Sequence, residues 1–249
     1  MAEFNLGALS LTSGVSNPTR TINLSNFEDT YSFSVTSDRN INLGVVGPES
    51  LTVQVFRDFN GNGVVDGADK QIAINSNTRT NEAINLSAFA SDVDPGSYIA
   101  RVSREKQTID FGISRPYSLK LSADPVSTPS KILAREHSFS PLFNNSRLQS
   151  FKGSVGNTDN TDTAILAVLD KGSYRFELKD LTADADFRLI QDRNNNRIVD
   201  PGEAMTTSRR GGTRSEVFTR ELEVGNYFLQ ASQVSGNANY TMTVAPVVI

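Results

Sequence analysis

The chain has 249 residues, with 24 Lys and Arg against 28 Asp and Glu, which gives a formal net charge of −4 at pH 7. Cysteine and tryptophan are absent and histidine occurs once, so a disulfide framework and the usual nitrogen and sulfur ligands of zinc, copper or non-haem iron are excluded. The basic residues are scattered along the chain, and we expect no nucleic-acid partner.

Nothing in the sequence predicts a membrane span, because no stretch of about 18 apolar residues is present. The first residues, Met1 to Leu6, lack the basic and apolar regions of a signal peptide. The protein is therefore cytoplasmic, or exported with its signal removed, or exported by a route that uses no N-terminal signal. The sequence does not choose among these three.

Several short strands are predicted in the first half of the chain. Apolar and polar residues alternate with a period of two in four segments, 31–35, 41–45, 51–55 and 98–102. Alternation of this kind places one face of a strand on a core and the other in water, as in antiparallel sheets. No segment has an apolar stripe of helical period, so the sequence predicts an all-β protein.

An Asp/Asn-rich segment, 58–69, follows the third of these strands. Oxygen-bearing side chains stand at loop positions 1, 3, 5, 9 and 12, with glycine at position 6 and a backbone carbonyl available at position 7. This is the spacing of calcium-binding loops, in which about six to eight oxygens surround the ion. The predicted ligands of a first calcium ion are Asp58, Asn60, Asn62, the carbonyl of Val64, Asp66 and Asp69.

The second half of the chain repeats the first at a nearly constant offset. Asp162-Thr163 lies 133 residues after Asp29-Thr30, and the Asp/Asn-rich segment recurs 134 residues later. Gly225-Asn226-Tyr227 likewise matches Gly96-Ser97-Tyr98. A period of this length indicates duplication of a whole domain and not a solenoid.

The repeated loop, 192–203, keeps the ligand positions while the residues between them change. Its position 12 is a glutamate, the residue expected to bind calcium through both oxygens. Position 6 is Arg197 in place of glycine, so a non-glycine residue must adopt a left-handed or strained conformation at a cost of about 1 kcal/mol. The predicted ligands of a second ion are Asp192, Asn194, Asn196, the carbonyl of Ile198, Asp200 and Glu203.

Another interpretation of both loops requires no ion. Asp and Asn side chains in turns cap backbone amides, and Asn-Gly pairs are ordinary turn residues. Turn chemistry alone does not demand five ligands at fixed spacing in two copies, so we favour calcium. Because a strand leads into each loop, through 53–56 and 187–190, we expect the ion to staple a loop and not to open a groove as in helix-loop-helix sensors.

Between the copies, segment 125–133 combines two prolines with small polar residues and predicts a short, stiff linker. The expected domains are therefore 1–124 and 134–249. Many short alternating strands separated by turn residues favour a sandwich. The sequence thus predicts two tandem antiparallel β-sandwich domains.

A set of short segments also carries a family resemblance. In the first copy these are 29–35, the DxNxNG loop, 95–102 and 117–121, and in the second copy they are 181–186 and 224–229. Together they resemble the bacterial pre-peptidase C-terminal domain. The resemblance implies jelly-roll-like sandwiches that accompany secreted peptidases and serve adhesion, targeting or assembly without catalysis. The second copy departs from the first at Ala164 and Leu166, which replace Tyr31 and Phe33.

We therefore expect a non-catalytic calcium-binding module with two ions, one per domain, that acts outside the cell or at its surface. Its partner would be a protein or polysaccharide surface. The alternative is a self-assembling subunit of a surface filament or layer, hence a homo-oligomer, because tandem sandwiches offer edge strands for pairing. A hydrolase fits less well: a triad would need His137, which lies outside both repeat cores, and a glycosidase would need a free carboxylate pair.

Overall fold

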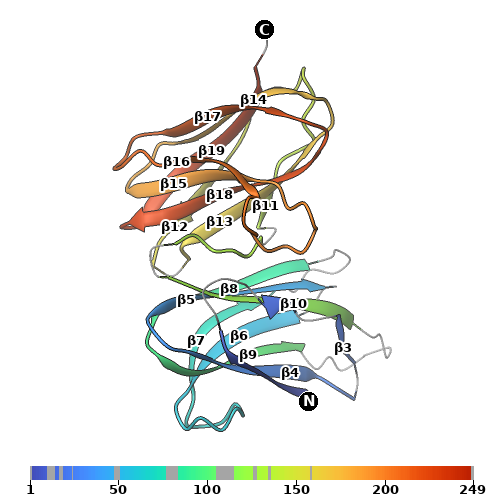
Figure 1. Ribbon diagram of the computed structural model, residues 1–249, viewed down its shortest axis with the longest axis vertical. Helices are drawn as coiled ribbons and strands as arrows, with labels where there is room; N and C mark the ends of the chain where they lie inside the picture. The colour runs from blue at the N-terminus through green and yellow to red at the C-terminus, as the bar shows by residue number, and fades with distance from the viewer. Residues whose placement is uncertain are drawn as a thin grey trace. The chain divides into compact units, whose positions relative to one another are not determined.

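The computed structural model describes most of the chain (Figure 1), namely residues 2–9, 15–16, 19–23, 25–47, 51–76, 84–104, 115–125, 128–133, 136–157 and 159–247. Across these residues the secondary structure consists of strands, turns and isolated bridges, which confirms the all-β prediction. The same residues contain no helix long and apolar enough to cross a membrane. The chain divides into two compact units, Met1–Val126 and Ser127–Ile249.

The first unit is a sandwich of two sheets with jelly-roll-like connections. Its first sheet has the order β1-β4-β9-β6-β7 and its second the order β2-β10-β5-β8, with β3 also paired to β10. The predicted strands at 31–35, 41–45, 51–55 and 98–102 lie in β4, β5, β6 and β9. The bounds are β1 Ala2–Ala8, β2 Val15–Ser16, β3 Arg20–Ile22, β4 Glu28–Val35, β5 Arg39–Gly47, β6 Leu51–Asp58, β7 Lys70–Ser76, β8 Ile84–Val93, β9 Gly96–Arg104 and β10 Arg115–Asp124.

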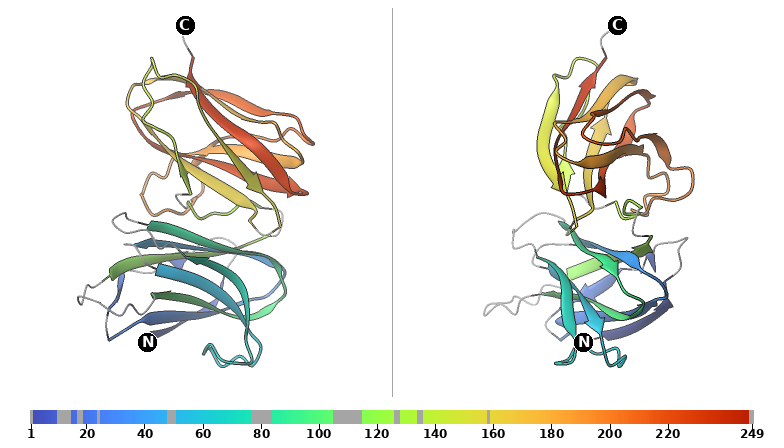
Figure 2. Two further views of the ribbon diagram at one scale, coloured as in Figure 1. Left: turned by 180° about the vertical axis from the view of Figure 1, so that it is seen from behind. Right: turned by 90° about the vertical axis from the view of Figure 1, so that its left-hand side faces the viewer.

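The second unit repeats this arrangement (Figure 2), as the predicted duplication requires. Its sheets have the orders β11-β13-β18-β15-β16 and β12-β19-β14-β17, in which each strand of the first sheet occupies the place of its counterpart in the first unit. The bounds are β11 His137–Ser138, β12 Gln149–Val155, β13 Thr161–Val168, β14 Gly172–Lys179, β15 Asp184–Ile190, β16 Ala204–Ser208, β17 Glu216–Leu222, β18 Gly225–Ser235 and β19 Ala238–Pro246.

One strand pair in each unit departs from the antiparallel prediction. β1 pairs in parallel with β4, and the two-residue β11 pairs in parallel with β13. Period-two alternation is the same in parallel and antiparallel strands, so it carries no signal for the direction of this edge strand. The other paired strands are antiparallel.

Each unit has its own apolar core between its two sheets. In β4, Tyr31, Phe33 and Val35 are buried in this core while Ser32 and Ser34 face outward. In β13, Ala164 and Leu166 occupy the places of Tyr31 and Phe33 and are also fully buried. The period of two therefore places the same face inward in both copies, although the side chains differ in size.

The segment predicted as a linker is in part a component of the second unit. Of its described residues, Ser130, Ile132 and Leu133 are buried, and Leu133 packs against Ile190 and Phe228. The second unit therefore includes residues before the predicted start at 134. The physical reason is that burial of the adjacent apolar side chains of Ile132 and Leu133 is favourable.

Candidate functional site

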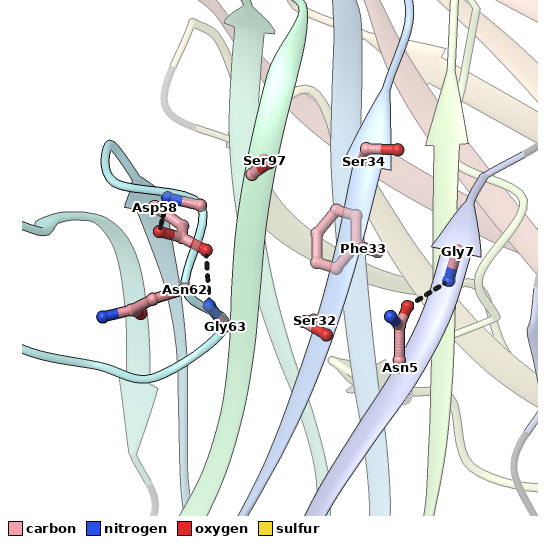
Figure 3. A pocket seen from close by; sticks show the side chains of 10 residues that line it. Asn5, Gly7, Ser32, Phe33, Ser34, Asp58, Asn62, Gly63 and Ser97 are labelled. Carbon is pink, nitrogen blue, oxygen red and sulfur yellow. Dashed lines mark hydrogen bonds between the residues drawn. The ribbon is translucent and has the colours of Figure 1, made fainter.

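The loop between β6 and β7, which extends from the strands of the first unit (Figure 2), contains the first predicted calcium site. Asp58 ends β6 and is only 4% exposed. Its two carboxylate oxygens accept hydrogen bonds from the backbone amides of Gly61 at 2.7 Å and Gly63 at 2.9 Å (Figure 3). The buried carboxylate thus turns the chain back toward the sheet, where Gly63 lies over Ser32.

Three further predicted ligands of this loop are joined through one carboxylate oxygen. The side-chain amides of Asn60 and Asn62 both donate to Oδ2 of Asp66, at 3.0 and 2.8 Å, while Oδ1 of Asp66 accepts the amide of Ala68. These hydrogen bonds stabilise the charged carboxylate and hold the pKa of Asp66 below its usual value. The bond from Ala68 has the largest effect, followed by those from Asn62 and Asn60. The oxygens of Asn60 and Asn62 accept backbone amides two residues ahead.

The last predicted ligand of the first loop carries an unsatisfied oxygen. Oδ2 of Asp69 accepts the amide of Asp66 at 2.9 Å. Oδ1 of Asp69 is buried and has no hydrogen-bond partner in the described part of the chain. A buried carboxylate oxygen without a donor costs about 1–3 kcal/mol, more if charged, and a cation would remove that cost.

The loop between β15 and β16 has the same pattern in the second unit. Both oxygens of the buried Asp192 accept backbone amides, from Asn196 and Arg197. The side chains of Asn194 and Asn196 both donate to Oδ2 of Asp200, each at 2.8 Å. The two loops therefore have a similar conformation as well as similar residue types.

The second loop differs at position 12. The oxygens of Glu203 accept the amides of Arg193 at 2.8 Å and Asp200 at 2.9 Å. The longer side chain reaches one more backbone amide than Asp69 does, so no oxygen of Glu203 is left without a donor. The backbone amides of Val64 and Ile198, whose carbonyls were predicted as ligands, donate to the Asn side chains two residues before them.

Backbone conformation confirms the predicted strain at Arg197. Gly61 and Gly63 have φ values of 68° and 74°, and their counterparts Asn195 and Arg197 have 55° and 62°. The loop thus requires the left-handed region at the same two positions in both copies. Only the first copy meets this requirement with glycine.

The predicted ligand carboxylates are not gathered around a single point. Among the described residues, no group of three or more His, Cys, Asp or Glu side chains is arranged to hold a metal ion. Hydrogen bonds from backbone and Asn amides hold both loops, as the interpretation without an ion also requires. Two features favour a cation: the possible ligands are hard oxygens, and Oδ1 of Asp69 is unsatisfied.

A polar pocket of about 320 Å³ lies beside the first loop (Figure 3). Its walls come from β1, β4, β9 and the loop itself, and they include Asn5, Ser32, Ser97, Asn62 and Gly63. Ser32 and Ser97 face away from the core, because their neighbours Phe33 and Tyr98 point inward. The sequence prediction missed this pocket, since the residues come from four separated segments.

A second feature that the prediction missed is a contact to the second loop. Leu133 donates its backbone amide to the carbonyl of Arg197 at 3.0 Å, and Val199 donates to the carbonyl of Lys131 at 2.8 Å. Ile132 and Ile198 thereby form an antiparallel bridge. The apolar pair at 132–133, within a polar linker, was the available signal.

The sequence matches no family model and no curated protein. Similar solved structures include one from the Sulfolobus Turreted Icosahedral Virus (12% identity, 96% of this chain and 94% of that chain, TM-score 0.27). Others are the PBSX exported protein XepA (9%, 94% and 86%, 0.30) and the CUB1-EGF-CUB2 domains of rat MASP-1 (10%, 97% and 99%, 0.28). Likenesses this weak carry no argument about function.

Proposed function

We propose that the chain is a non-catalytic module of two β-sandwich units that calcium stabilises, and that it acts in adhesion, targeting or structure outside the cell. The observation that carries the proposal is the paired loop geometry. Two loops 134 residues apart keep the same hydrogen bonds from two Asn side-chain amides to one Asp carboxylate oxygen, while their other residues differ. The same ligand set includes the buried Oδ1 of Asp69, which has no hydrogen-bond partner among the residues that the structure describes.

Calcium would be held by the residues that already shape each loop. Asp58, Asp66 and Asp69 supply carboxylate oxygens in the first loop, and Asp192, Asp200 and Glu203 supply them in the second. The amide oxygens of the intervening Asn residues and the carbonyls of Val64 and Ile198 would complete an oxygen shell. The bound ion would tie the ends of two adjacent strands and add stability to each unit.

The direct test is calcium titration of chelator-treated protein by calorimetry, with thermal unfolding in parallel. We expect binding of two ions and a rise in the unfolding midpoint, because a ligand at a hundredfold excess over its Kd adds about 2.7 kcal/mol per site. The matched variants Asp66→Asn and Asp200→Asn should each remove about one ion. Absence of both heat and midpoint shift in the unaltered protein would overturn the calcium proposal.

A second candidate is a subunit that assembles with copies of itself. Ile74 favours it, because this side chain is 55% exposed on β7, which forms one edge of its sheet. An apolar edge strand offers both backbone groups and buried area to another strand. Size-exclusion chromatography with light scattering, with and without calcium, separates the two candidates. A concentration-independent monomer in both conditions contradicts assembly.

A further inference from the structure

The two units differ in whether the outer backbone edge of the Asp/Asn-rich loop is hydrogen-bonded to another segment. In the second unit, the carbonyl of Arg197 and the amide of Val199 are paired with segment 130–133. The corresponding groups in the first unit are the carbonyl of Gly63 and the amide of Val65. Neither makes a hydrogen bond within the described part of the chain, and the side chain between them, Val64, is 38% exposed.

A pair of polar side chains shows how the second unit holds its segment. Arg188 and Gln230 face each other across β15 and β18, with Nε and Nη2 of Arg188 donating to Oε1 of Gln230. Nη2 of Arg188 also donates to the carbonyl of Ser130 at 2.8 Å, and Nε2 of Gln230 donates to the carbonyl of Ile132 at 3.1 Å. The pair thus presents two donors to an extended backbone.

The first unit contains the same pair with the residues exchanged between strands. Gln54 on β6 and Arg101 on β9 are register partners, and Nε and Nη2 of Arg101 donate to Oε1 of Gln54 at 2.9 and 2.6 Å. Here the remaining donor groups contact side chains in place of a backbone segment. Nε2 of Gln54 donates to Gln71, and Nη1 of Arg101 lies 3.7 Å from Oε2 of Glu28.

The side chains beside this edge are also larger in the second unit than in the first. Arg197 covers the ring of Phe228 at 4.9 Å, and Ile165 packs beside it. Their counterparts in the first unit are Gly63 and Ser32, which both line the pocket of about 320 Å³. The first unit therefore has an unpaired backbone edge and an adjacent space where the second unit is filled.

We propose that this edge of the first unit, defined by Gly63, Val64 and Val65 and the pocket beside them, binds an extended polypeptide segment from a partner by β-bridge pairing. The segment would donate an amide to Gly63 and accept one from Val65, as residues 131–133 do in the second unit. The inference names a partner class for the proposed binding module. It rests on that function but not on calcium, since the pairing uses backbone groups.

The test uses the full chain, labelled with ¹⁵N, and the acetylated and amidated peptide Thr-Pro-Ser-Lys-Ile-Leu, which copies residues 128–133. Amide shifts are followed up to millimolar peptide, in calcium and in chelator. We expect saturable shifts at Val64 and Val65. A second peptide, in which leucic acid replaces the last residue and an ester replaces its amide, lacks the N–H meant for Gly63 and should bind about fivefold more weakly.

Two results would overturn the proposal. One is the absence of saturable shifts at the first loop, or shifts at Arg197 and Val199 alone, which would mean that the peptide only exchanges with segment 130–133. The other is equal affinity of the ester and amide peptides. Peptide binding in chelator, in a protein that shows neither heat nor a shift in the unfolding midpoint with calcium, would refute the calcium proposal and support the peptide site, so the two failures are distinguishable.

Discussion

The side-chain amide of Asn26 donates a hydrogen bond of 2.8 Å to Oδ1 of Asp29 in the first unit. The second unit has Asp159 in the place of Asn26 and Asp162 in the place of Asp29. Desolvation, followed by the negative charge of Asp162, raises the pKa of Asp159 to about 7. The pKa of Asp162 is raised as well, mainly by burial, while Tyr240, His137 and the amide of Ser154 oppose that shift.

This pair predicts that the second unit loses stability as pH rises. A carboxyl group with a higher pKa in the folded state holds its proton more tightly there, so its contribution is greatest below about pH 4 and is lost as pH rises toward about 7. Solvent reaches Asp159, and we therefore expect a loss of only about 1 kcal/mol. Asp159→Asn should remove this loss and stabilise the unit at pH 8, measured by urea unfolding at pH 5 and pH 8.

The reciprocal variant Asn26→Asp supplies the control, because it should introduce the same pH dependence into the first unit. An unchanged pH dependence in Asp159→Asn would contradict the assignment.

A buried tyrosine–aspartate pair should stabilise each unit. Tyr117 donates to Oδ2 of Asp29 at 2.5 Å, and Tyr240 donates to Oδ2 of Asp162. Tyr117→Phe leaves that oxygen of Asp29 without its donor in the core, at an expected cost of about 1–3 kcal/mol in urea unfolding. Tyr31→Phe removes only the hydroxyl that bonds to Tyr117 and should cost less. Equal costs for the two variants would contradict the proposed order.

Position 12 of the first loop should limit its affinity for calcium. Asp69→Glu gives this loop the residue found in the second, with a side chain long enough to reach a further backbone amide, as Glu203 does. We expect calorimetry to show tighter binding at the first site, by about fivefold to tenfold. Asp69→Asn, which lacks the charge at the same length, should weaken it. Tighter binding by both variants would exclude a role for the carboxylate.

Because the backbone at position 6 of the first loop is left-handed, replacing the glycine there should lower the free energy of unfolding by about 1 kcal/mol. Gly63 has a φ of 74°, and a Cβ placed there would lie 3.5 Å from Ser32, an ordinary contact. The cost of Gly63→Ala is therefore conformational, about 1 kcal/mol. Gly67→Ala in the same loop meets nothing within 4 Å and should be neutral. Comparison of unfolding midpoints in urea decides between them.

The segment before β11 should contribute to folding of the second unit. Leu133 is 1% exposed and Leu148 is 64% exposed. We expect Leu133→Ala to cost about 2–4 kcal/mol in the unfolding of this unit, and Leu148→Ala to change it by less than about 0.5 kcal/mol. If residues 125–133 acted only as a linker, both variants would have small effects.

The sequence by itself determined the strands, the two loops and their repetition. Alternating residues such as Tyr31, Phe33 and Val35 specify a strand and its inward face locally, without knowledge of the partner strand. The strand–loop–strand order around each loop followed from the same signal, and the left-handed conformation of Arg197 followed from its alignment with Gly63. The calcium ions and the family resemblance stay predictions, because residue spacing indicates a ligand set and not an occupied site.

Only the tertiary structure decided which distant groups meet. It paired β1 in parallel with β4, attached Leu133 to the second unit and brought Tyr240 to Asp162. It also joined Arg188 to Gln230, the pair that holds segment 130–133, and within the described part of the chain it left the backbone edge of the first loop unpaired. The physical reason is common to all of these: strand pairing and burial depend on contacts between remote segments, whereas periodicity and turn chemistry depend on neighbours along the chain.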